Sequence, residues 1–254
     1  MFWALAANQI DTRGFEFEHV LRDIQTLNEW ALDGRLEVTA LSLHAYPFVQ
    51  DRYVLLPHGA SMGSGYGPIV VAREPLSAEE LRAEEIAVPG TLTTAFLVLR
   101  MVLGEELAFR AMPFDRIIDA VKSGDVRAGL LIHEGQLTYV DAGLVKCLDL
   151  GEWWLLETGL PLPLGVNTIR RDLGEAIPDV SDVLRDSIDA ALAHRDDALD
   201  YALGFGRGMD AERGDRFVQM YVNDLTRDYG AEGRQAIREL LARARPGIEV
   251  EFVG

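Results

Sequence analysis

Cysteine and long apolar runs are scarce in this 254-residue sequence, and each shortage excludes a class of protein. The single cysteine, Cys147, rules out an internal disulfide and a zinc site built from paired thiolates. No apolar run approaches the ~18 residues that a membrane-spanning helix needs. The apolar start at residues 2–7 lacks a basic leader and is too short for a signal peptide. We therefore expect a cytoplasmic protein that is neither exported nor bound to a membrane.

Positive charge is scarce as well. The chain has 24 Lys and Arg residues against 41 Asp and Glu residues, which gives a formal net charge of −17 at pH 7. Such a surface repels phosphate backbones and anionic lipids, so we expect no nucleic-acid partner. The same charge leaves room for a small anion in a sheltered pocket. Apolar residues make up 48% of the chain, which is enough to build a core of its own.

Strand-like and helix-like segments alternate along the first two thirds of the chain. Period-two or continuous apolar patterns predict extended segments, at residues 15–21, 38–43, 53–56, 69–72, 86–90, 128–133 and 161–168. Helical spacing and capping residues predict helices, at residues 2–7, 24–32, 45–49, 95–103, 117–121, 150–157, 180–194, 196–204, 215–228 and 231–245. This alternation is typical of an α/β protein with parallel sheets.

The order of these segments predicts two lobes. Two short αβ units, residues 1–72 and 86–149, precede a helical C-terminus. If that C-terminus packs on the first unit, the chain must cross between the lobes twice. We therefore predict that residues 1–72 and 168–254 form lobe 1, that residues 73–167 form lobe 2, and that a cleft separates them.

His133 is the candidate base. It follows an apolar run that begins at Ala128, so it stands at the carboxyl end of a predicted buried strand. Open parallel sheets bind ligands at that edge, and an imidazole placed there could take a proton. A histidine that is held by hydrogen bonds inside the core fits the same pattern. Spacing alone does not decide between the two interpretations.

The helix entry at residues 89–95 is a second candidate site. Free N–H groups at a helix N-terminus, together with hydroxyl groups such as that of Thr94, favour a carboxylate site. Ordinary capping of the helix by threonine explains the same pattern.

Other polar residues have equally open roles. Ser42 and His44 stand at the end of the predicted strand 38–43 and could border a cleft, although Ser42 could also bond to the backbone. Asn28 could reach a ligand from its helix or cap a neighbouring segment. The glycines at residues 59–67 match neither phosphate-loop motif, and the chain has no Gly-x-Ser-x-Gly elbow.

The sequence strings carry more information than their spacing. They occur in the order DIQTLN at 23–28, VTALS at 38–42, GSGYGP at 63–68, VPG at 88–90, TTA at 93–95, IHE at 132–134, DLGEWW at 149–154, TGLPLPLG at 158–165 and RRDLG at 170–174. This set resembles the 1,4-dihydroxy-6-naphthoate synthase family of the futalosine route to menaquinone. The resemblance implies a two-lobe fold like that of type II periplasmic binding proteins, with a central cleft and two crossover strands. It also implies a lyase that converts cyclic dehypoxanthinylfutalosine to 1,4-dihydroxy-6-naphthoate and dihydroxyacetone without a metal or an organic cofactor.

The resemblance also assigns roles to single residues. His133, in the string IHE, matches the family's base, which would begin the reaction by taking a proton. The substrate is a small aromatic carboxylate, which hydroxyl and helix-entry N–H groups could hold. The resemblance assigns substrate binding to residues of three segments, which are Asn28, Ser42, Leu43, His44, Thr94 and Ala95.

One departure from the family concerns the start of the chain. The family begins with a strand and a Ser-Pro-Cys-Pro-Asn-Asp-like loop, whereas Met1 lies inside the helix that follows them. We therefore expect that this form binds or turns over its substrate poorly.

Other functions stay open. Chorismate dehydratase of the same pathway would use the same fold for a different elimination. A non-catalytic small-molecule-binding protein would need an export signal or a lipid anchor. A regulatory sensor would need a DNA-reading module or a basic patch, and the sequence shows neither.

Overall fold

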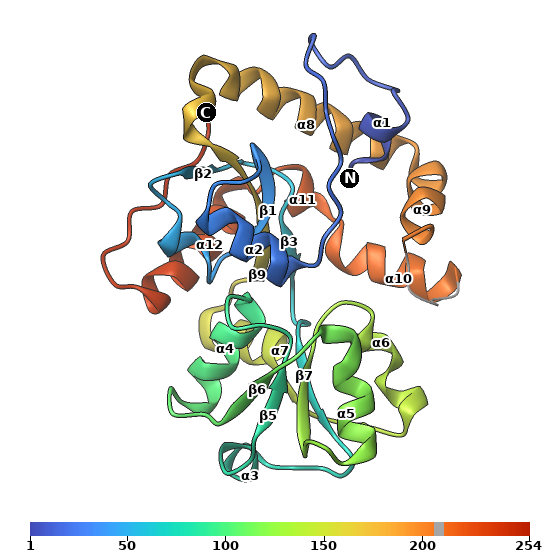
Figure 1. The fold of residues 1–254 in the computed structure, drawn as a ribbon, viewed down its shortest axis with the longest axis vertical. Coiled ribbons are helices and arrows are strands. Elements are labelled where there is room, and N and C mark those ends of the chain that lie inside the picture. Colours follow the sequence, from blue (N-terminus) through green and yellow to red (C-terminus); the bar gives the residue numbers. More distant parts are fainter. Residues whose placement is uncertain (206–210) are drawn as a thin grey trace.

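The computed structural model describes residues 1–205 and 211–254 and folds them into two lobes (Figure 1). In the sheet of lobe 1, one long strand pairs with three others: β9 (Leu162–Arg170) with β1 (Val38–Ser42), β2 (Tyr53–Leu55) and β3 (Ser61–Gly63). The sheet of lobe 2 has the order β6 (Phe109–Ala111), β5 (Ile86–Val88), β7 (Ala128–Leu131), β4 (Ile69–Ala72) and β8 (Val145–Asp149). Two α/β lobes joined by two crossing segments confirm the predicted fold class.

Helices cover both sheets. Lobe 1 carries α1 (Trp3–Ala6), α2 (Ile24–Leu32), α8 (Ile177–Ala193), α9 (Arg195–Leu203), α10 (Ala211–Tyr221), α11 (Asp224–Arg227), α12 (Gly230–Ala244) and the 3₁₀ helices η1 (Tyr46–Phe48) and η4 (Arg171–Ala176). Lobe 2 carries α3 (Ala78–Arg82), α4 (Thr94–Leu103), α5 (Ile117–Ser123), α6 (Gly135–Thr138), α7 (Leu150–Thr158) and the 3₁₀ helices η2 (Phe114–Arg116) and η3 (Tyr139–Ala142). None of the described helices is long and apolar enough to cross a bilayer.

The chain crosses between the lobes earlier than predicted on both occasions. The boundary at residue 72 assigns β4 to lobe 1, but β4 pairs with β7 and β8 in the sheet of lobe 2. The boundary at residue 168 assigns the first part of β9 to lobe 2, but β9 lies in the sheet of lobe 1 from Leu162 onward. A strand belongs to the sheet that satisfies its backbone hydrogen bonds, and apolar patterns do not reveal which sheet that is.

Two predictions about strands are wrong. The sheets are mixed and not parallel, because β9 runs antiparallel to its three partners and β4 runs antiparallel to β7 and β8. Only β5 has named parallel neighbours, which are β6 and β7. Residues 15–21 are not a strand. Their alternation arises because Phe15 and Phe17 pack against the apolar cluster beneath α8.

Local differences in the helices have plain causes. The helix expected at 45–49 is the short η1, which contains Pro47 near its start. The helix expected at 215–228 is divided into α10 and α11, because the Asn223 side chain accepts the backbone N–H of Leu225 and starts a new helix. The strand β6 escaped the sequence analysis because all of its residues are exposed.

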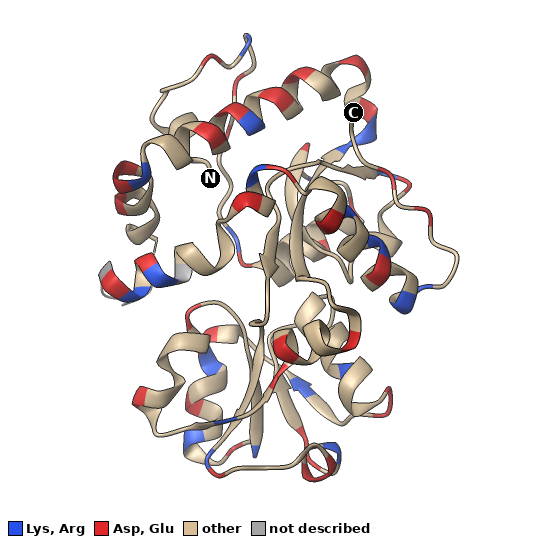
Figure 2. Cartoon of the chain, turned by 180° about the vertical axis from the view of Figure 1, so that it is seen from behind, with Lys and Arg blue, Asp and Glu red and all other residues tan. Residues whose placement is uncertain are grey.

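Packing and charge agree with the sequence. Trp154 is fully buried, and its Nε1–H donates to the Pro161 carbonyl at 3.1 Å, which fixes α7 against the start of β9. Figure 2 shows acidic side chains on the helices of both lobes, with arginines between them. Most of the arginines' ion pairs are partly exposed, so each contributes little to stability.

Candidate active site

A cavity of about 630 Å³ lies between the lobes and contains four of the predicted site residues. Lobe 1 contributes the segment before α2 together with parts of β1 and β9, and lobe 2 contributes the start of α4 and the segment that follows β7. The volume is typical of a site for a small molecule. Predominantly apolar walls with a few polar groups would suit an aromatic ligand with a polar substituent.

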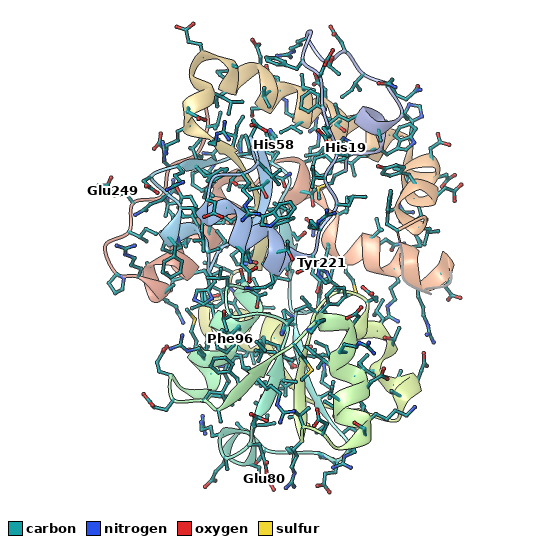
Figure 3. The ribbon with its side chains drawn as sticks, viewed as in Figure 1. His19, His58, Glu80, Phe96, Tyr221 and Glu249 are labelled. Atoms are coloured by element: carbon teal, nitrogen blue, oxygen red, sulfur yellow. The ribbon has the colours of Figure 1, made fainter. Side chains whose placement is uncertain are left out.

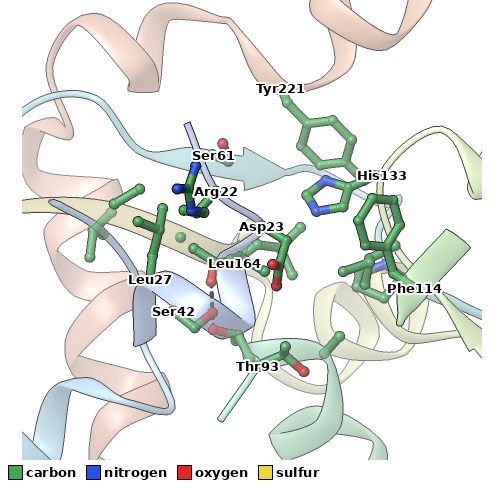
Figure 4. Close-up of a pocket in the computed structure, with 18 of the residues that line it drawn as sticks. Arg22, Asp23, Leu27, Ser42, Ser61, Thr93, Phe114, His133, Leu164 and Tyr221 are labelled. Carbon is green, nitrogen blue, oxygen red and sulfur yellow. Dashed lines mark hydrogen bonds between the residues drawn. The ribbon is translucent and has the colours of Figure 1, made fainter. Parts of the chain in front are cut away.

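His133 faces this cavity and not the core. The buried strand β7 delivers it to the interface between the lobes, two residues beyond the end of the strand. Figure 4 shows its imidazole on one side of the pocket, with Ser42 on the other. The ring packs edge-on against Phe114, with 4.9 Å between the ring centroids. The backbone of His133 has φ = 53°, a left-handed conformation that is uncommon for a non-glycine residue and is often found at functional sites.

The helix entry at α4 contributes backbone donors. Thr93 caps α4, because its Oγ1 accepts the N–H of Phe96 at 3.2 Å. The Thr94 hydroxyl donates to the Leu164 carbonyl at 2.5 Å and accepts the N–H of Leu43 at 2.9 Å. Threonine hydroxyls were expected to hold the ligand, but these two are already engaged with the backbone. The first-turn N–H groups of Thr94 and Ala95 have no acceptor within the helix, so they are the donors that remain.

Ser42 presents its hydroxyl to the cavity because Asn28 holds it from behind. The Asn28 Nδ2 donates to Ser42 Oγ at 3.0 Å and to the Leu92 carbonyl at 3.2 Å, and its Oδ1 accepts the Ser42 N–H at 2.8 Å. With its oxygen accepting from Asn28, the Ser42 hydroxyl hydrogen can be donated to a ligand. Asn28 itself is fully buried and does not line the cavity.

Leu43 and His44 also lie outside the cavity lining. Leu43 is fully buried in the core of lobe 1. His44 packs against Phe48 and Phe96, with ring centroids 6.3 and 6.4 Å away. Burial lowers the pKa of His44, which favours a neutral ring. The structure therefore brings Ser42, Thr94, Ala95 and His133 together and places Asn28, Leu43 and His44 behind them.

Several residues of the lining escaped the sequence analysis. Arg22 lines the cavity, and its guanidinium lies 5.4 Å from the centre of the Trp30 ring. Asp23, expected only as a helix cap, also lines it. Burial acts to raise the pKa of Asp23, but hydrogen bonds from Thr26 outweigh it and hold that pKa below its usual value.

Asn167 and Tyr221 complete this group. Asn167 is 2% exposed, lines the cavity, and carries an Nδ2 with no hydrogen-bond partner among the described residues. A polar residue inside an otherwise apolar strand was the only sequence signal for it. Tyr221 reaches the cavity from α10, far along the chain, and no local pattern singled it out.

Comparisons with known proteins assign this architecture to a family. The sequence profile described as menaquinone biosynthesis matches residues 1–246. The chain belongs to this family. Two curated relatives carry the name "1,4-dihydroxy-6-naphtoate synthase": one from Thermus thermophilus is 44% identical over 96% of this chain and 89% of its own length. The other, from Streptomyces coelicolor, is 40% identical over 87% of this chain and 80% of its own length.

Solved structures agree with the family and the fold. A crystal structure of a protein from Archaeoglobus fulgidus is 46% identical, with a TM-score of 0.90, and the match covers 97% of this chain and 93% of that one. The alkanesulfonate-binding protein from Xanthomonas axonopodis pv. citri, bound to MOPS, is 14% identical with a TM-score of 0.61, covering 89% and 84%. At that identity the similarity shows the periplasmic-binding-protein-like fold alone.

Proposed function

We propose that this protein is a 1,4-dihydroxy-6-naphthoate synthase, a lyase of menaquinone biosynthesis. Its substrate would be cyclic dehypoxanthinylfutalosine, and its products 1,4-dihydroxy-6-naphthoate and dihydroxyacetone. The observation that carries the proposal is the placement of His133 across an inter-lobe cavity from Ser42, in a chain 44% identical to a curated synthase over most of its length.

The cavity suits the two tasks of this reaction. Ser42 and the N–H groups at the start of α4 form a set of donors for the aryl carboxylate, and the partial positive charge at the helix start favours an anion. Asn167 and Arg22 offer further donors from lobe 1. These local donors allow an acidic protein to bind an anionic substrate.

His133 is the base in this proposal. The carbonyl of the substrate acidifies a neighbouring C–H, and the imidazole takes that proton and starts elimination and ring opening. Aromatisation to the naphthalene then drives the later steps. A positioned base contributes ~10²–10⁴-fold, so exclusion of water by lobe closure must supply the remaining acceleration. We place the reaction in the cytoplasm, in keeping with the single free Cys147.

The test is direct. The purified protein is incubated with cyclic dehypoxanthinylfutalosine, and the ultraviolet spectrum of a naphthoate is followed. His133→Ala should reduce turnover by ~10²–10⁴-fold and leave unfolding and substrate binding unchanged. His194→Ala, at the exposed end of α8, is the matched control and should keep full activity. An active His133→Ala variant would remove His133 from the mechanism, and turnover of chorismate in a parallel reaction would replace the proposed activity.

A further inference from the structure

Helix α10 belongs to lobe 1 but contacts lobe 2 directly. Tyr221, at its C-terminal end, donates its hydroxyl hydrogen to Gln136 Oε1 on α6 at 2.7 Å. Arg213, near its other end, forms an ion pair with Asp141 in η3, with a second Nη2–Oδ1 contact of 3.2 Å. Figure 1 shows α10 lying next to α6 across the boundary between the lobes. Both contacts therefore cross the cleft on the side of the segment that follows His133.

The Tyr221–Gln136 contact is connected to the backbone of His133. The Gln136 N–H donates to the His133 carbonyl at 3.2 Å, so the position of Gln136 is transmitted to the residue that carries the imidazole. His133 adopts φ = 53° there, a conformation that persists only when its surroundings hold it. Gln136 is thus bonded through its side chain to lobe 1 and through its backbone to His133.

Tyr221 is itself firmly placed. It is 7% exposed and packs edge-on against Tyr66, with ring centroids 5.8 Å apart. Tyr66 stands in the first crossing segment and donates its hydroxyl hydrogen to the carbonyl of Met220. Tyr221 lines the cavity on the same side as His133 (Figure 4), and Figure 3 shows it at the level where the lobes meet.

We propose that Tyr221 and Gln136 are a positioning pair, which holds His133 in its left-handed conformation over the cavity when the lobes are closed. The Arg213–Asp141 ion pair is the outer part of the same closure. The proposal rests on the role of His133 in the proposed function. It adds that lobe closure and the orientation of the base are one event, because the same glutamine carries both contacts.

The first experiment measures turnover. Tyr221→Phe and Gln136→Leu each remove the inter-lobe hydrogen bond, and each should lower kcat by ~10–100-fold, since small misplacements of a reacting group have effects of that size. KM should change far less. The double variant should be no slower than the slower single variant, because the two side chains act as one unit. Tyr201→Phe on α9, whose ring packs on Phe205 within lobe 1, is the matched control and should keep the wild-type kcat.

The second experiment measures closure without any chemistry. The single native cysteine allows Cys147→Ser to clear the background, so that spin labels can be placed at Glu79→Cys on α3 and Glu232→Cys on α12. Tyr221→Phe should shift the distribution of inter-lobe distances to longer values, and Tyr201→Phe should not. If the wild-type protein fails to turn over its substrate, the proposed function fails and this distance measurement alone tests the pair. Single variants with a kcat within twofold of wild type, additive effects in the double variant, or an unchanged distance distribution would each overturn the proposal.

Discussion

Asn28 offers a sharp test, because the family resemblance assigns it to substrate binding and the structure gives it another task. Its side chain is fully buried and makes three hydrogen bonds that join α2, β1 and the turn before α4. At about 1 kcal/mol for each bond, Asn28→Ala should lower the free energy of unfolding by about 3 kcal/mol. For a chain of this size the melting temperature should fall by about 6–12 °C.

The measurement is urea unfolding of Asn28→Ala beside the wild type, with Asn8→Ala at an exposed position as the matched control. The midpoint should move for the first variant and stay within error for the second. Ser42 would lose the group that orients its hydroxyl, so substrate affinity should fall as a secondary effect. A variant of unchanged stability with weakened substrate binding would refute this reasoning and return Asn28 to the binding site.

Three further changes probe other parts of the structure. Burial lowers the pKa of His58, whose Nε2 lies 3.1 Å from a hydroxyl oxygen, so the unfolded chain binds its proton more readily; unfolding free energy should fall as the pH drops below about 6.5, and His58→Gln should flatten that slope in urea titrations at successive pH values. Gly59→Ala should reduce both stability and substrate affinity, measured by thermal melting and by titration, because φ is +85° and the new Cβ would stand 2.0 Å from Asn167 Nδ2. Thr94→Val should lower the unfolding free energy by about 1–3 kcal/mol, since two buried hydrogen bonds are lost, whereas equal stability would show that the hydroxyl is not needed there.

Much of the architecture could be predicted from the sequence, because local signals were strong. The capping residue Asp23 and the spacing of apolar residues gave the bounds of α2, and the continuous apolar run Ile69–Ala72 marked β4. The pairing of these strands could not be predicted in the same way. Strand direction and sheet membership depend on contacts between distant segments, such as Val38 with Ile169, which no local pattern records.

The candidate site shows the same division. His133 could be found because a strand pattern ended beside it, and Ser42 and Thr94 because they stood at strand and helix ends. The roles within the site depend on where side chains point, so Asn28 was assigned to the ligand although it holds Ser42. Tyr221 could not be found at all, since it meets Gln136 across 85 residues of chain.

The central place of β9 in the first sheet has a consequence for synthesis on the ribosome. Each of β1, β2 and β3 finds its partner in β9, which is translated more than 90 residues after the last of them. The second sheet uses only strands between Ile69 and Asp149, so its assembly can begin while the earlier strands still wait. The lobe whose synthesis starts first is therefore the one that is finished last.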